Sequence, residues 1–63
     1  MSVYTYFVDG QIDGDWRLVE DSCTLQRAQD VAREHAKDYE RVEIWCKETD
    51  QLVATYSEHG QVA

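Results

Sequence analysis

Residues 24–39 read TLQRAQDVAREHAKDY, and this stretch decides the fold. From Leu25 onward the apolar residues recur with the period of an α-helix. One stripe of the expected helix is formed by Leu25, Ala28, Ala32, Ala36 and Tyr39. The hydroxyl of Thr24 can accept a hydrogen bond from a free backbone N–H of the first turn, which makes Thr24 the expected N-cap. The pattern predicts a helix over residues 25–39 whose three alanines allow close packing on a sheet.

The residues before this helix predict a hairpin. Residues 3–8, VYTYFV, are β-branched or aromatic throughout, which favours a strand. Residues 15–20, DWRLVE, are expected to return beside it, because the intervening stretch holds two Asp-Gly pairs that favour tight turns. Gln11 and Ile12 could extend either arm of this hairpin.

Two more strands are expected after the helix. Residues 41–47, RVEIWCK, alternate between the two faces of a strand, and residues 52–57, LVATYS, form the last strand. Residues 59–63 are expected to be a loose tail. The predicted fold is therefore α+β, a single domain over residues 1–63 with the order ββαββ. Its four-stranded antiparallel sheet has the order 2-1-3-4, a right-handed crossover, and one helix on one face.

A sheet covered on one side leaves the other side open. The expected helix side of the sheet contains Phe7, Trp16, Leu18, Val42, Ile44 and Cys46. The expected open side contains Tyr4, Tyr6, Arg17, Arg41, Glu43, Trp45, Lys47 and Val53. Tyrosine, tryptophan and arginine are typical of interface hot spots, so Tyr4, Tyr6, Arg17 and Trp45 are candidate binding residues. The alternative is that these aromatic residues serve strand formation and cross-strand packing.

Length and charge bound the function. The chain has 63 residues and a formal net charge of -7. A chain of this size has a thin core, and a deep substrate cavity is not expected. The acidic balance argues against direct binding of nucleic acid or of an anionic membrane. No segment resembles a membrane span or a signal peptide, which predicts a cytoplasmic protein.

Metal and catalytic motifs are weak, so neither a cofactor nor an enzymatic activity is expected. Asp9, Gln11, Asp13, Gly14 and Glu20 have the spacing of a calcium loop, but strands rather than helices flank them. Cys23, His35, Cys46 and His59 lack the close pairing typical of zinc sites. Cys23 precedes the helix N-terminus, where a thiolate is favoured, without a surrounding oxyanion hole. A disulfide between Cys23 and Cys46 stays open as an alternative to two reduced thiols.

The acidic residues fall into groups along the chain. The first group contains Asp9, Asp13, Asp15, Glu20 and Asp21, and the second contains Asp38, Glu40 and Glu43. Glu48, Asp50 and Glu58 form a third group. Carboxylates on a rigid scaffold can occupy a groove that binds phosphates, and complementary charge speeds association. The alternative is that the negative charge serves solubility alone.

In overall character the chain is similar to the small acidic proteins that phages encode against host defences, including anti-CRISPR proteins. The similarity lies in size, acidity, a compact domain starting at Met1 and the absence of catalytic motifs. It implies a non-enzymatic inhibitor whose acidic surface mimics nucleic acid and occupies a basic groove of a CRISPR or other defence nucleoprotein complex. The alternative function is a homodimer, or another self-associating accessory module, that uses the open aromatic face.

Overall fold

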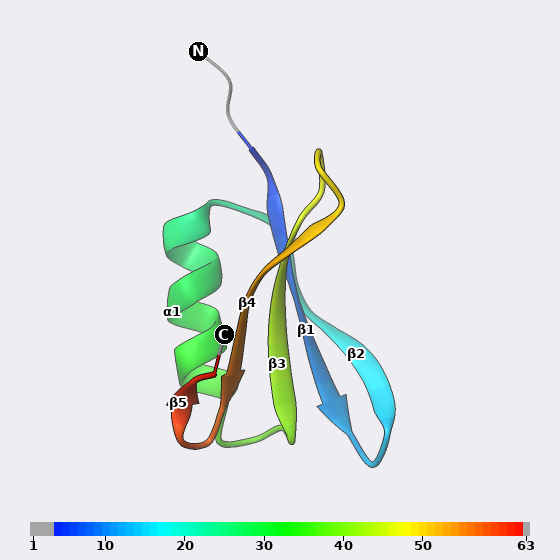
Figure 1. Ribbon diagram of the computed structural model, residues 1–63, viewed down its shortest axis with the longest axis vertical. Coiled ribbons are helices and arrows are strands. Elements are labelled where there is room, and N and C mark those ends of the chain that lie inside the picture. The colour runs from blue at the N-terminus through cyan, green and yellow to red at the C-terminus, as the bar shows by residue number, and fades with distance from the viewer. Residues whose placement is uncertain (1–3, 63) are drawn as a thin grey trace.

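The computed structural model describes residues 4–62 and contains one antiparallel sheet with a helix against one face (Figure 1). Over these residues the strands lie in the order β2-β1-β3-β4-β5. The elements are β1 (Tyr6–Ile12), β2 (Asp15–Cys23), α1 (Leu25–His35), β3 (Arg41–Cys46), β4 (Gln51–Ser57) and β5 (Gly60–Gln61). The chain is therefore a two-layer α+β fold, as the sequence predicts.

The end of the chain adds a strand where the sequence analysis expects a loose tail. Residues 60–61 pair with β4, and the Val62 N–H donates to the Thr55 carbonyl at 2.7 Å. Gly60 has a φ of 104°, in the left-handed region that favours glycine, so the chain can reverse tightly after β4. The predicted order of the first four strands is confirmed, and the sheet has a fifth strand beyond β4.

The first hairpin is longer than predicted. β1 continues to Ile12 rather than ending at residue 8, and β2 continues to Cys23 rather than residue 20. Asp13 and Gly14 form the turn with φ values of 53° and 83°, as a two-residue hairpin loop of the mirror-image type requires. The other Asp-Gly pair lies inside β1. The predicted first strand residue, Val3, lies outside the described residues.

The inner position of Gly10 in β1 is set by the ring of Tyr39. A Cβ atom on Gly10 would lie 2.6 Å from Cδ1 of Tyr39. Beside this contact, the Glu40 N–H donates to the Gln11 carbonyl at 2.8 Å, which holds the loop after α1 against the strand. The close approach of the ring to the backbone requires glycine at this position.

The helix begins as predicted but ends at His35 instead of residue 39. The N-cap is confirmed, because the Arg27 N–H donates to the Thr24 hydroxyl at 3.1 Å. Ala36 is the C-cap. Tyr39 was expected on the helical stripe, but it lies in the following loop and covers Gly10. The packing of Tyr39 on β1 thus takes the place of the helical turn that was predicted for residues 36–39.

The core lies between α1 and the sheet. The inner side chains of β3 are Val42, Ile44 and Cys46, all buried as predicted. The buried residues of the core cluster are Val8, Ala28, Val31, Ala32, Ala36, Val42, Ile44, Ala54 and Tyr56. The alanines of α1 permit the close approach of helix and sheet that the sequence predicts.

The predicted faces of β1 are wrong. Val8 and Gly10 are buried beneath the helix layer, so strand alternation places Tyr6 on the same side and Phe7 on the opposite side. Tyr6 is indeed packed against the core cluster. The sequence of residues 3–8 did not indicate which side chains face the helix, because every aromatic or β-branched residue in it is compatible with burial.

The predicted faces of β2 are also wrong. Arg17 lies opposite Gly10, and directly paired residues share a face, so Arg17 belongs to the helix side. Trp16 and Leu18 are exposed by 45% and 58% rather than buried. An irregular register farther along the β1–β2 pair allows Val19 to pack against the core. A bulge of this kind shifts the alternation that the sequence pattern assumes.

The contact between Gly10 and Tyr39 yields a testable expectation. Gly10→Ala should lower the free energy of unfolding by about 1–3 kcal/mol, because the new methyl group overlaps the ring. Tyr39→Ala should also destabilise the protein, but the double variant should lose about 1 kcal/mol less than the sum of the single losses. Urea unfolding of the four proteins measures this coupling. Additive losses would contradict the proposed contact.

Candidate functional site: the open face of the sheet

The sheet face opposite α1 is built from three rows of paired residues. The first row contains Phe7, Trp45 and Leu52, and the second contains Leu18, Asp9, Glu43 and Thr55. The third row contains Trp16, Gln11 and Arg41. These residues alternate with those that face the helix, and together they define the open face.

The open face is rich in exposed apolar area. Leu52 is exposed by 43%, in addition to Trp16 and Leu18, while Phe7 and Trp45 are half-buried. Large apolar side chains gathered on one side of a small protein are typical of an interaction surface. The sequence predicted an aromatic open face, but of its four named candidates only Trp45 lies there.

The other three candidates occupy different places. Tyr4 is exposed and precedes β1, Tyr6 packs against the core, and Arg17 lies on the helix side. Phe7, Trp16 and Leu18 replace them on the open face. No local signal in the sequence could have found these three, because their orientation depends on Gly10 and on the bulge in β2.

Glu43 lies at the centre of the open face and is well compensated. Its side chain is 13% exposed. The Trp45 Nε1–H donates to Glu43 Oε1 at 3.2 Å, and Arg41 Nε lies 3.4 Å from Glu43 Oε2. These two contacts provide a hydrogen bond and a positive charge for the carboxylate.

Asp9 lies beside Glu43 and lacks such compensation. Burial raises the pKa of the Asp9 carboxyl above its ordinary value, and the negative charges of Glu43 and Asp21 raise it further. Within residues 4–62 the Asp9 side chain makes no hydrogen bond or ion pair. The open face thus presents a half-buried carboxylate with anionic neighbours and no cation of its own.

Asp21 is the opposite case. Lys47 pairs with Asp21 and donates to the Ser22 hydroxyl at 2.8 Å. The hydrogen bond from Lys47 lowers the pKa of Asp21 below its ordinary value. Glu20 also has a cation, since Arg27 Nε donates to its Oε2 at 3.0 Å. The acidic group of the first hairpin is therefore divided between paired and unpaired carboxylates.

The other acidic candidates lie toward one end of the molecule. The β1–β2 turn and the loop between α1 and β3 meet there (Figure 1), and the Gly14 N–H donates to Glu40 Oε1 at 3.3 Å. Asp13 lies in this turn and Asp15 follows it, while Oδ2 of Asp38 lies 3.8 Å from Nδ1 of His35. Among the acidic candidates, Asp9 on β1 and Glu43 on β3 lie directly opposite each other in the sheet.

The surroundings of Cys23 disfavour a thiolate. Cys23 and Cys46 are both free thiols. Burial raises the pKa of Cys23, and the charge of Glu20 raises it further, which favours the protonated form. The Cys23 thiol donates to the Tyr6 carbonyl at 3.4 Å. At Cys23 these two effects outweigh the stabilisation of a thiolate by the nearby helix N-terminus.

Metal-ligand geometry is absent from the described part of the chain. Among residues 4–62 no group of three or more His, Cys, Asp or Glu side chains is placed to hold a metal ion. The residues with calcium-loop spacing lie in and around the β1–β2 hairpin, whose paired strands extend the loop. Between Tyr4 and Val62 no helix has the length and apolar character that crossing a membrane requires.

No protein-family model, curated protein or solved structure matches this chain.

The two aspartates predict opposite effects on stability. The raised pKa of Asp9 means that its contribution to folding is most favourable below its unfolded pKa and is lost as pH rises through the folded pKa. Asp9→Asn should therefore raise the melting temperature at pH 7, and the gain should vanish below a pH of about 4. Thermal unfolding followed by circular dichroism at both pH values measures the effect.

Asp21→Asn is the matched control. The lowered pKa of Asp21 means that its contribution is present above its unfolded pKa and is lost as pH falls through the folded pKa. This variant should lower the melting temperature at pH 7 and have little effect in acid. Shifts of the same sign for both variants at pH 7 would contradict the described electrostatics.

Proposed function

We propose that this chain is a non-enzymatic protein-binding module whose open face docks on a cationic surface of a protein partner. The proposed partner is a CRISPR or another defence nucleoprotein complex, and the docking site on it is a basic groove that otherwise holds nucleic acid. Occupation of the groove would exclude nucleic acid and so inhibit the partner.

The observation that carries the proposal is the state of Asp9. A half-buried carboxylate beside Glu43 and Asp21, without a cation within the described residues, is an unfavourable arrangement in the free protein. An arginine or lysine of a partner placed beside Asp9 would relieve the repulsion. A contact made in a desolvated setting is stronger than the same contact in water.

The apolar residues of the open face support the same conclusion. Trp16 and Leu18 lie on the rows that contain Gln11 and Asp9, so a partner that reaches Asp9 also covers them. Central apolar and aromatic anchors supply most of the binding energy of protein interfaces. The charge of Asp9 would then set the orientation and the choice of partner.

Self-association through the open face is a second candidate, because Trp16 and Leu18 on β2 and Leu52 on β4 are exposed on the same face. In a face-to-face dimer centred on the sheet, the central strands β1 and β3 of the two copies would meet. Asp9 and Glu43 of each copy would then approach those of the other, and like charges oppose that contact at neutral pH. This electrostatic cost favours a cationic partner over a second copy.

The test compares two single-charge variants. We expect Asp9→Asn to weaken binding to the captured partner by at least about tenfold, because it removes the charge at the centre of the interface. Glu34→Gln removes the same charge from the exposed side of α1 and should change affinity less than about twofold. The partner is captured on immobilised protein from a bacterial lysate that contains active defence nucleases, and is eluted with a salt gradient.

The partner is then purified, and binding is measured by calorimetry with and without competing nucleic acid. Equal effects of the two variants would mean that net charge, rather than the open face, causes binding. Recovery of the chain itself, with a dimer in sedimentation at pH 7, would replace the proposal with the self-associating module.

A further inference from the structure

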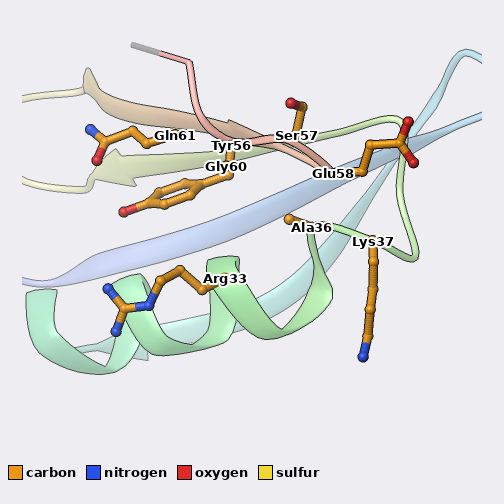
Figure 2. A pocket seen from close by; sticks show the side chains of 8 residues that line it. All are labelled: Arg33, Ala36, Lys37, Tyr56, Ser57, Glu58, Gly60 and Gln61. Atoms are coloured by element: carbon orange, nitrogen blue, oxygen red, sulfur yellow. The ribbon is translucent and has the colours of Figure 1, made fainter.

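A second surface lies on the helix side, away from the open face. A groove of about 450 Å³ runs between the last turns of α1 and the β4–β5 hairpin (Figure 2). Its lining includes Ala36, Tyr56 and Gly60, with Arg33 on the helix side and Gln61 on the hairpin side. The groove has the size of pockets that hold small organic ligands.

Tyr56 gives the groove a hydroxyl that has no hydrogen-bond partner among the described residues. The residue is only 4% exposed, and its ring belongs to the core cluster. Its hydroxyl makes no hydrogen bond with any other residue from Tyr4 to Val62. The buried side-chain oxygen that lacks a partner within the described residues is Oγ1 of Thr55, so the Tyr56 hydroxyl is accessible from the groove while its ring packs in the core.

Arg33 places a positive charge on the same side of the groove. Figure 2 shows the Arg33 guanidinium and the Tyr56 hydroxyl pointing toward the same end of the groove. The guanidinium donates to Asp30 through Nη2, and a guanidinium has several further N–H donors. Lys37 and Glu58 also line the groove, but their charged groups point away from it (Figure 2).

The groove therefore combines an apolar floor with donors at one end. A tyrosine hydroxyl and a guanidinium together suit an acceptor that carries negative charge, and a carboxylate accepts from both. Basic residues in the last helical turn also interact favourably with the helix dipole, which alone would explain Arg33. The dipole does not account for the Tyr56 hydroxyl, a second accessible donor at the same end of the groove.

We propose that this groove binds a small organic carboxylate, with the carboxylate held by Tyr56 and Arg33 and an apolar body against Ala36 and the Tyr56 ring. The site is separate from the open face and does not depend on the function proposed for that face.

The experiment is an NMR titration of the protein with 3-phenylpropionate, monitored by backbone amide shifts. Saturable shifts are expected in the last turns of α1 and in the β4–β5 hairpin. The uncharged 3-phenylpropanamide should bind at least about tenfold more weakly, because it lacks the charge-assisted hydrogen bonds.

Two variants remove the donors and one serves as the control. Tyr56→Phe keeps the ring in the core and should weaken binding of 3-phenylpropionate about tenfold, as should Arg33→Gln. Arg27→Gln removes an equal charge from the first turn of α1, outside the lining of the groove, and it should retain affinity within about twofold.

Three outcomes would overturn the proposal. The first is an absence of saturable shifts in the wild-type protein at millimolar probe. The second is an unchanged affinity of Tyr56→Phe, with its fold verified by circular dichroism. The third is a map of shifts on the open face around Trp45 and Leu18 instead of on the groove.

Discussion

The stacking of Tyr39 on Gly10 is the contact on which the rest of the structure depends. It fixes which side of β1 faces the helix, because Gly10 must point toward the ring that covers it. Val8 then enters the core, and Phe7 and Asp9 are turned to the open face. The same contact draws the loop after α1 onto the sheet, where the backbone hydrogen bond from Glu40 to Gln11 precedes the start of β3. The absence of a Cβ atom at Gly10 thus sets both the orientation of β1 in the sheet and the position of the loop that follows α1.

The sequence predicts the elements of this fold better than their faces. The helical stripe, the Thr24 cap and the alternation of β3 are local patterns, and each appears in the structure. The orientation of β1 depends instead on Tyr39, which lies 29 positions from Gly10 (39 − 10) and whose helical spacing suggested another role. The bulge in β2 likewise has no local signature. The open face was therefore predicted to exist, while most of its residues could be assigned only once tertiary contacts were known.

The charge of the chain is distributed unevenly between paired and unpaired groups. Four of the six lysine and arginine residues, Arg27, Arg33, Arg41 and Lys47, pair with carboxylates of the chain. Most of these pairs are exposed and contribute little to stability. Their effect is to neutralise particular carboxylates, so that the remaining negative charge is localised. Asp9 differs from the rest because it is half-buried and remains uncompensated in an apolar setting.

The short strand β5 has a consequence for the behaviour of the chain in concentrated solution. It pairs with only the last part of β4, and the backbone beside Leu52 and Val53 has no strand on its outer side within the described residues. Loss of β5 by proteolysis would extend that free edge along the whole of β4. An apolar edge without protection recruits further strands and leads to fibrous aggregates. Residues 60–61 thus cover the end of this edge, and a chain cleaved before β5 should aggregate at lower concentration than the intact one.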